Sequence, residues 1–538
     1  MLVAGMARTK ALLDSVLEPA VFASTVPETR AITARRIEFV GSFQPAVQER
    51  GASPTSVVLR PRDDAGIDQD GQRYVERTNA TSLMTTDPQT GLSRVFIIPR
   101  GVRPYKNEID EAARKLNAPT GYCSDVLSYE LVGGTWAALP ALLMSAPEKG
   151  FLFEDPRISV FIDESGKRRI LLSGTDYAPH APGAKDPDVM NRYVELELDE
   201  AGRPLPVPVD ANTGRPDFKN LSPPPRAKAG GGFAFLDAKN AVVATNENGN
   251  LVVRTRFRPQ SDDPAFASHP GSKPWGYGEQ VFVFTSFAEM QAYHWDHALD
   301  DVLSGHEGVL AKIEGRVRPL EAKIIAVDDT FHELYPQAVL APGKGRGFGP
   351  GTAPVRVRRE GNDVFLSEGK GAEERKIGVV PSALAARFLV ADGEVMYLSF
   401  DHEVRYCVDH RDSDGGPVDA IKRVYTCSIR LWDKTLTKVE RVYADAIQPL
   451  EPHQRGGSGI LDLHHVYPMG RVIIAEESAR PLVRVTTGES DAHTGSYDFD
   501  IMTLLEEMAP GGERTASGQV YRPSPPPSPA EPRAPEER

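Results

Sequence analysis

Cysteine is scarce in this sequence, and its three residues, Cys123, Cys407 and Cys427, show no CxxC spacing. They cannot form a disulfide framework, which fits a reducing compartment. Long apolar runs are missing too, since no stretch approaches the roughly 18 apolar residues of a membrane span. The first 24 residues are apolar but are interrupted by charges such as Arg8 and Asp14, so they predict a short helix rather than a secretory signal. We expect a cytoplasmic protein with no membrane partner.

Positive charge is also in short supply. The formal net charge is −13 and the isoelectric point is near 5.5. A sequence-independent nucleic-acid binder needs a basic face for phosphates, so we expect no nucleic-acid partner. The sequence contains no GxSxG elbow, no GxxxxGK[ST] loop and no GxGxxG after a strand. The most familiar hydrolase and nucleotide-binding motifs are therefore absent.

Glycine and proline are plentiful, with 47 and 45 residues spread along the chain. Between them lie short β-branched runs separated by turn signals such as ENGN and ADGE, which predict an all-β protein. Helical spacing is clear only near the ends and at 107–116. The predicted strands lie at 94–99, 158–162, 168–174, 193–199, 240–245, 250–257, 280–286, 394–400, 425–433 and 471–477.

Several groups of these predicted strands share the same order of features: an apolar run, then a polar break, then a strand with an acidic turn. Weak repetition at irregular spacing is typical of a β-propeller with variable loops, although a sandwich or a β-helix could give the same composition. We predict an N-terminal extension over 1–80, a catalytic domain over 81–510 and a disordered Pro-rich tail over 511–538. The predicted blades are 90–150, 151–230, 231–303, 346–450 and 456–508, with 304–345 as an addition to the β core.

The segment EDPRI at 154–158 places two carboxylates and a cation beside an apparently buried hairpin. The plain interpretation is a solvated loop before the strand at 158–162. Another possibility is a pair of acids with a chemical role, because adjacent carboxyl groups held by Pro156 and followed by Arg157 can serve as acid and ligand. The residues alone leave both open.

EDPRI, with the strand pair and SGTDYAP that follow it, resembles glycoside hydrolase family 130, the β-mannoside phosphorylases and hydrolases. Five further segments resemble motifs of that family and come in the family's order over roughly 90–505. They are KNAVVATNENGNLVVRTRFRP (239–259), QVFVFTSFAEMQAYHWDHAL (280–299), GFGPGTAPV (347–355), MYLSFDHEV (396–404) and VTTGESDAHTG (485–495).

The resemblance implies a five-bladed β-propeller with an axial active site and inverting attack on a β-mannosidic bond, usually by inorganic phosphate. It assigns the proton donor to Asp155 and implies that the proton passes through a sugar hydroxyl; Glu154 would be structural or sugar-binding. It implies no cofactor other than phosphate as co-substrate, and an oligosaccharide or mannoside as the partner. The residues expected to bind phosphate or substrate are Arg100, Arg192, Lys239, Arg256, Arg258, His402 and Asp491.

Cations are what a phosphorolytic site needs, because phosphate is already an anionic nucleophile. Arg254, Arg256 and Arg258 alternate along one strand and should share a face. Buried together they require a counter-charge, which can be a bound anion or an acidic residue from a neighbouring blade.

Two features depart from the family. Phe257 stands where members commonly carry a His, which removes one expected phosphate contact, and the segment 356–393 is longer than usual. The HWDH segment at 294–297 lies where the family has its own His-Trp, so we expect no metal site. A β-mannoside phosphorylase is the favoured function. An inverting β-mannosidase and a non-catalytic glycan-binding propeller are the alternatives, and a homo-oligomer is possible.

Overall fold

The structure is a computed structural model of the 538-residue chain. The description below covers the residues whose placement is defined. These are 35–36, 40–41, 76–104, 122–132, 135–146, 151–178, 188–224, 234–260, 278–298, 301, 317–325, 347–409, 420–447, 466–467, 472–475, 482–489, 493–507, 513–514 and 520–521.

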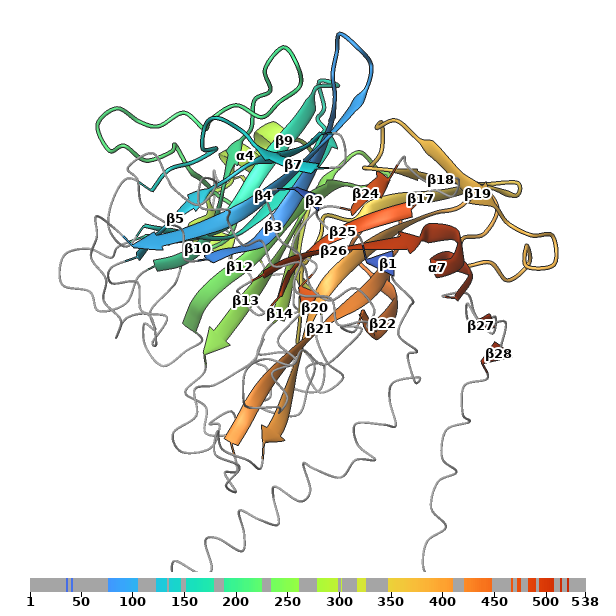
Figure 1. The fold of residues 1–538 in the computed structure, drawn as a ribbon. Coiled ribbons are helices and arrows are strands. Elements are labelled where there is room, and N and C mark those ends of the chain that lie inside the picture. The colour runs from blue at the N-terminus through green and yellow to red at the C-terminus, as the bar shows by residue number, and fades with distance from the viewer. Residues whose placement is uncertain are drawn as a thin grey trace, which may run out of the picture.

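Strands make up nearly all of the described secondary structure, as the all-β prediction requires (Figure 1). Each apolar run named above forms a strand or part of one. One expectation differs in detail. Glu154 and Asp155 do not precede their strand in a loop, because they lie inside β8 (Leu152–Ile162). The predicted helix at 107–116 falls outside the described residues.

The first two sheets come from consecutive stretches of the chain. The first has the order β2 (Val40–Gly41), β7 (Thr135–Ala138), β6 (Tyr129–Val132), β4 (Ser93–Pro104) and β3 (Glu76–Thr86), with β5 (Tyr122–Val126) also paired to β4. The second has the order β11 (Lys219–Asn220), β10 (Asp188–Glu195), β9 (Arg168–Ala178) and β8. In each of these sheets a long strand, β3 or β8, lies at one edge and forms a hairpin with the strand that follows it in the chain.

The other three large sheets are also built mostly from strands that follow one another along the chain. The third contains β12 (Ala234–Thr245), β13 (Leu251–Gln260), β14 (Gly278–Phe284) and β15 (Glu321–Ile325) in chain order. The fourth has the order β19 (Arg375–Val379), β18 (Asp363–Ser367), β17 (Val355–Glu360), β20 (Val395–Asp409), β21 (Ala420–Trp432) and β22 (Val439–Ile447), with β16 (Gly347–Gly349) paired to β20. The fifth has the order β1 (Arg35–Arg36), β26 (His493–Asp500), β25 (Leu482–Glu489) and β23 (Val466–Tyr467), with β24 (Val472–Ala475) paired to β25.

The sheets contact one another in sequence, in a propeller-like arrangement. The strand β3 of the first sheet packs against β25 of the fifth sheet and β8 of the second, and β8 packs against β12 of the third. Further round, β16 contacts β13 and β14, and β21 contacts β23. In Figure 1 the colours accordingly pass from blue β3 and β4 through green β12 and β13 to orange β20 and β21 and red β25 and β26. Because much of the chain between these strands is not described, the count of five blades stays a prediction.

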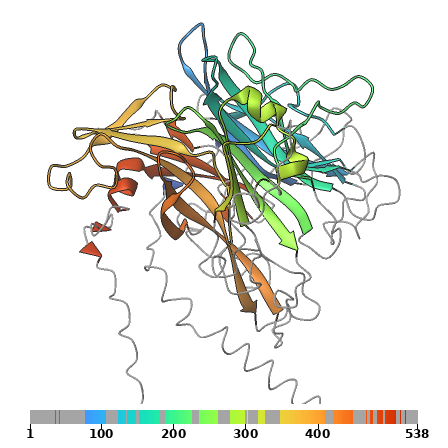
Figure 2. The ribbon, with the colours of Figure 1, turned by 180° about the vertical axis from the view of Figure 1, so that it is seen from behind.

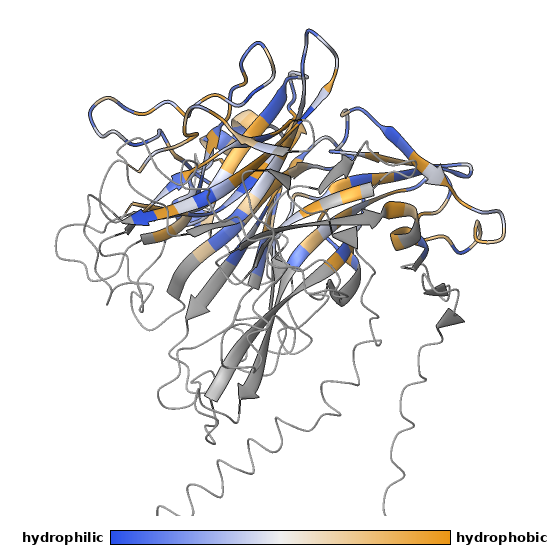
Figure 3. Ribbon diagram, viewed as in Figure 1, coloured by the Kyte–Doolittle hydropathy of each residue, from blue (hydrophilic) through white to orange (hydrophobic). Residues whose placement is uncertain are grey.

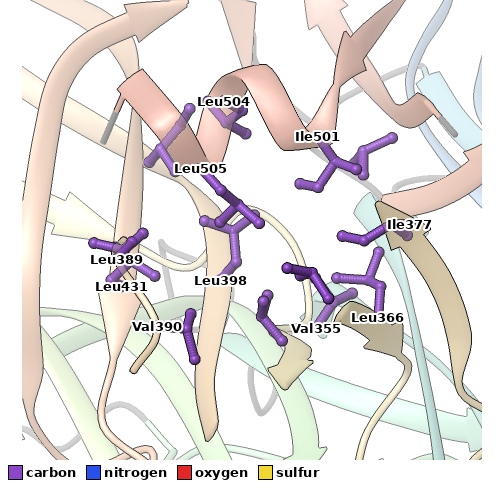
Figure 4. Close-up of a cluster of buried hydrophobic side chains, with 14 of the residues drawn as sticks. Val355, Leu366, Ile377, Leu389, Val390, Leu398, Leu431, Ile501, Leu504 and Leu505 are labelled. Carbon is purple, nitrogen blue, oxygen red and sulfur yellow. The ribbon is translucent and has the colours of Figure 1, made fainter. Parts of the chain in front are cut away.

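Four of the contacts between neighbouring sheets are filled by separate layers of apolar side chains. These layers join the first sheet to the second, the second to the third, the third to the fourth and the fourth to the fifth. The last of these is closed by α7 (Ile501–Glu507), whose Ile501, Leu504 and Leu505 belong to the same cluster as Leu398 and Leu431 (Figure 4). Inner strands such as β8 and β13 are buried on both faces, because each lies between two neighbouring sheets. Figure 3 accordingly shows both apolar and polar residues along the strands.

The ranges expected to be additions contribute some strands. β15 lies within 304–345 and forms an edge of the third sheet, next to β14. β3 begins at Glu76, inside the predicted N-terminal extension, and β27 (Glu513–Arg514) pairs with β28 (Val520–Tyr521) inside the predicted tail. The helix α4 (Phe287–Ala292), seen on the near side in Figure 2, packs on β14. The domain boundaries themselves stay predictions.

Candidate active site

EDPRI forms a bulge inside β8. The pairing of β8 with β9 shifts between Glu154 and Arg157, and Asp155 has a φ of 53°. Proline cannot donate to a strand ladder and is therefore placed at edges and bulges, while Asp tolerates the left-handed conformation better than most residues. The sequence Asp-Pro thus breaks the ladder locally. The bulge therefore takes Asp155 out of the regular alternation of side chains along β8.

Glu154 lies in a group of polar side chains from three sheets. Arg100 Nη1, from β4, is 3.3 Å from its Oε1, and Lys239 Nζ, from β12, is 3.2 Å from its Oε2. The Tyr177 hydroxyl donates to Oε2 at 2.7 Å, and Lys239 Nζ donates to that hydroxyl at 2.5 Å. Burial alone would raise the pKa of Glu154, but the charges of Lys239 and Arg100 outweigh it and lower this pKa to about 2. Glu154 is therefore ionised at neutral pH.

Arg157 and Arg256 make up the second half of the site. The Arg157 side chain is 1% exposed; its Nε donates to the Gly351 carbonyl at 3.1 Å and its Nη1 to the Asp155 carbonyl at 3.0 Å. Burial lowers the pKa of Arg157 to about 10; the charge of Asp155 opposes this shift and that of Arg256 adds to it. Two buried guanidinium groups thus lie close enough to repel one another beside the Asp155 bulge.

The Gly-Pro segment at 347–351 packs its backbone directly on these two arginines. A Cβ added to Gly349 would come within 2.8 Å of Arg256 Cδ, so glycine permits the close approach. Gly351 accepts from Arg157 through its carbonyl and donates its N–H to Asp401 Oδ1 at 3.1 Å. The GFGPG motif therefore covers the cations of the site with backbone rather than with side chains.

We call Arg100, Glu154, Asp155, Arg157, Lys239 and Arg256 the cationic cluster. It contains four cations and two carboxylates, a formal excess of two positive charges. Arg100, Glu154 and Lys239 keep 12%, 20% and 19% of their side-chain surface exposed, so the edge formed by these three is open to solvent. Such a cluster is suited to a small anion with several acceptor oxygens.

Arg254 has a different environment from Arg256, although both point to the same side of β13. Its Nε donates to Glu279 at 2.6 Å and its Nη2 to Asp401 at 2.9 Å; Arg430 contacts the same two acids. All four side chains are at most 1% exposed. For Arg254 the counter-charge is thus acidic residues, one on β14 and one on the neighbouring sheet. We call Arg254, Arg430, Glu279 and Asp401 the buried quartet.

Arg192 is not brought together with Lys239. It pairs with Gly174 across β9 and β10, on the face of the second sheet opposite to Glu154 and Tyr177. Its Nη1 lies 3.1 Å from the buried Asp176 carboxylate, which Arg215 Nη2 also contacts at 3.2 Å. Its proposed role in binding stays a prediction.

The structure describes only the backbone of two other predicted site residues. Arg258 lies in β13 opposite Asp237, and His402 lies in β20 opposite Gly349 and Cys427. The side chains of both residues, and that of Phe257, are not part of the description. Asp491 lies wholly outside the described residues. Arg100, Asp155, Lys239 and Arg256 are the predicted site residues that the described part of the chain brings together.

Sequence reasoning missed Asn79 and Tyr177. Asn79 Nδ2 donates to Asp155 Oδ1 at 2.7 Å, from a bulge in β3 where its own φ is 53°. A third bulge in β12 holds Asn240 at φ 62°. The three short segments TNAT (78–81), EDPR (154–157) and KNAV (239–242) are the signal that could have found Asn79, since each contains a residue that tolerates positive φ at its second position. No comparable signal points to Tyr177.

The described residues contain no group of three or more His, Cys, Asp or Glu side chains arranged to hold a metal ion. Within the same residues, no helix has both the length and the apolar character needed to cross a membrane.

No protein-family model and no curated protein sequence matches this chain. Solved structures that are similar to it include a mannose phosphorylase from Leishmania mexicana in complex with phosphate ion, at 12% identity and a TM-score of 0.40, over 95% of this chain and 98% of that one. A GDP-Man-dependent mannosyltransferase from the same organism is similar at 10% identity and a TM-score of 0.38, over 80% and 86%. A structure from the GH130 family of mannoside phosphorylases, which contains glycoside hydrolases that target β-1,2 mannosidic linkages in Candida mannan, is similar at 11% identity and a TM-score of 0.34, over 89% and 96%.

Proposed function

We propose that this protein is a divergent member of glycoside hydrolase family 130 that cleaves β-mannosidic bonds by phosphorolysis with inversion. The observation that carries the proposal is the cationic cluster, in which a carboxyl group on a bulge, Asp155, is bordered by an excess of positive charge. Asp155 supplies the proton that the leaving oxygen requires. A phosphate oxygen forms the new bond to C1 as the bond from C1 to the leaving oxygen breaks, which gives α-mannose 1-phosphate.

The state of Glu154 supports phosphate over water as the nucleophile. An inverting hydrolase needs a second carboxylate that accepts a proton from water. Glu154 is a poor candidate for this base, because Lys239 and Arg100 stabilise its ionised form and so weaken its basicity. Phosphate needs no base, and an anion bound between Arg157 and Arg256 would offset the repulsion between these two cations. Lys239, Arg157 and Arg256 are the proposed phosphate ligands.

The direct test is incubation with β-mannobiose of defined linkage or an aryl β-mannoside, with and without inorganic phosphate. We expect α-mannose 1-phosphate to form only when phosphate is present, detected by ³¹P NMR. Release of free mannose without phosphate would instead identify an inverting β-mannosidase. Binding of mannosides without turnover in either buffer would identify a glycan-binding propeller.

Replacement of Asp155 by Asn should abolish turnover and leave the fold intact. The amide cannot donate the required proton, and general acid catalysis is typically worth about 10²–10⁴ in rate. The fold should tolerate the change because Asn79 and Asn240 already occupy the equivalent bulges at positive φ. Activity is compared with the melting temperature of the same variant. Full activity in Asp155→Asn would remove this residue from the mechanism.

A further inference from the structure

Three neighbouring strands repeat one backbone feature with different side chains. β3, β8 and β12 each contain a shift in pairing, and each shift holds one non-glycine residue at positive φ, namely Asn79, Asp155 and Asn240. Such residues are uncommon, and Asn and Asp are the side chains that tolerate the conformation. The backbone at this position is therefore satisfied by Asn as well as by Asp. What sets β8 apart is that its residue can ionise.

Asn79 reaches the Asp155 side chain from the adjacent strand. The Nδ2–Oδ1 distance is 2.7 Å, and Asn79 is 1% exposed, so solvent competes little for the bond. An amide N–H can only donate, so Oδ1 of Asp155 must act as an acceptor. In the protonated acid the proton then belongs on the other oxygen, Oδ2.

We propose that Asn79 is a positioning residue, which confines the proton of Asp155 to Oδ2. This rests on the proposed function, in which Asp155 is the proton donor. The bond orients the acid before substrate arrives, because both groups are held by strand bulges rather than by loops. The proton is thereby directed to one side of the carboxyl group.

Charged side chains lie close to the bulge, and a test has to hold them constant. Arg157, from β8, is influenced by the charges of Asp155, Arg256 and Asp401. Glu154 is paired with Arg100 and Lys239. All of these residues are retained when only Asn79 is changed, so a change in kcat reports the loss of the amide.

The variant Asn79→Gly removes the amide and keeps the backbone, since glycine adopts positive φ without steric penalty. The matched control is Asn240→Gly, which makes the same substitution in the equivalent bulge of β12. Initial rates of β-mannoside cleavage are measured over a range of phosphate concentrations for the wild type and both variants. We expect kcat to fall about tenfold in Asn79→Gly, with little change in the KM for phosphate, and to change less than about twofold in Asn240→Gly.

The melting temperatures of both variants give a second and separate measurement, which shows whether the fold is retained. An unchanged kcat in Asn79→Gly, or an equal fall in Asn240→Gly, would overturn the proposal, as would a rise in the KM for phosphate as large as the fall in kcat. If the wild type cleaves no mannoside, the proposed function is refuted, whereas full activity in both the wild type and Asn79→Gly refutes only the positioning role.

Discussion

The buried quartet and the cationic cluster use the same kinds of side chain to different ends. Both draw on β13, where Arg254 belongs to the quartet and Arg256, two residues further on, to the cluster. The quartet has two cations and two carboxylates, is at most 1% exposed, and lies against the Trp432 ring, whose centroid is 4.0 Å from the Arg254 guanidinium and 4.4 Å from that of Arg430. The cluster has an excess of two cations and an exposed edge.

The difference separates structure from function within one charged region. In the quartet, burial opposes the charge of Arg254, but Asp401 and Glu279 outweigh burial and raise the pKa of this arginine. In the cluster, burial lowers the pKa of Arg157 and the nearby Asp155 does not reverse the shift. The four charges of the quartet balance one another within the fold, whereas the proposed phosphate would add negative charge to the cluster.

The largest effect is expected when the quartet is broken. Glu279→Gln removes one of the two negative charges that Arg254 and Arg430 share, and the loss of one partner from a buried ion pair typically costs about 3–5 kcal/mol of unfolding free energy. Urea denaturation followed by circular dichroism measures the change. Lys239→Ala, in the cluster, is the matched comparison and should stay within about 1 kcal/mol of the wild type. Equal stability losses for the two variants would erase the distinction between the groups.

Much of the fold could be predicted from short-range sequence signals. Runs such as ISVFI and NLVVRTRF, bounded by turn residues, gave strands because strand burial depends on local alternation and turn chemistry. β15, with the sequence EAKII, was missed because it is short and its one sheet neighbour, β14, is 37 residues or more away in the chain. Edge strands of this kind are specified by tertiary pairing rather than by their own pattern.

The site was only partly predictable for a similar reason. Alternation along 254–258 correctly placed Arg254 and Arg256 on one face, but the partners of each come from other sheets. The bond from Asn79 to Asp155 spans 76 residues, and Tyr177 reaches Glu154 only because β8 and β9 pair with a bulge between them. No local pattern contains that information.

A smaller effect, on function rather than stability, should follow from Lys239→Ala. Loss of a hydrogen bond to a charged group is worth about 1.5–3 kcal/mol, so the apparent KM for phosphate should rise roughly 10- to 100-fold. The KM for the mannoside should change far less, because the lysine is proposed to contact phosphate. Lys438→Ala, at an exposed lysine of the β21–β22 hairpin, is the control and should leave both constants unchanged. Cleavage that proceeds at the same rate without phosphate would contradict the subsite and favour an activated water.

The smallest effect concerns the acid stability that Glu154 gives to the cluster. Its folded-state pKa is depressed to about 2 from an ordinary value of 4.5; burial acts against this depression, and the charges of Lys239 and Arg100 cause it. A depressed carboxyl pKa contributes stability that is fully present above the unfolded value, so this contribution should be lost as the pH falls from about 4.5 toward 2. We therefore expect the unfolding free energy of the wild type to fall by on the order of 1 kcal/mol more than that of Glu154→Gln between pH 6 and pH 3, since partial exposure weakens the pairing.

Urea midpoints at the two pH values measure the difference. Glu440→Gln removes an equal charge from a surface pair with Lys438 and serves as the control for net charge. If Glu154→Gln and Glu440→Gln show the same pH dependence, Arg100 and Lys239 do not hold Glu154 ionised, and the argument against Glu154 as a catalytic base loses its support.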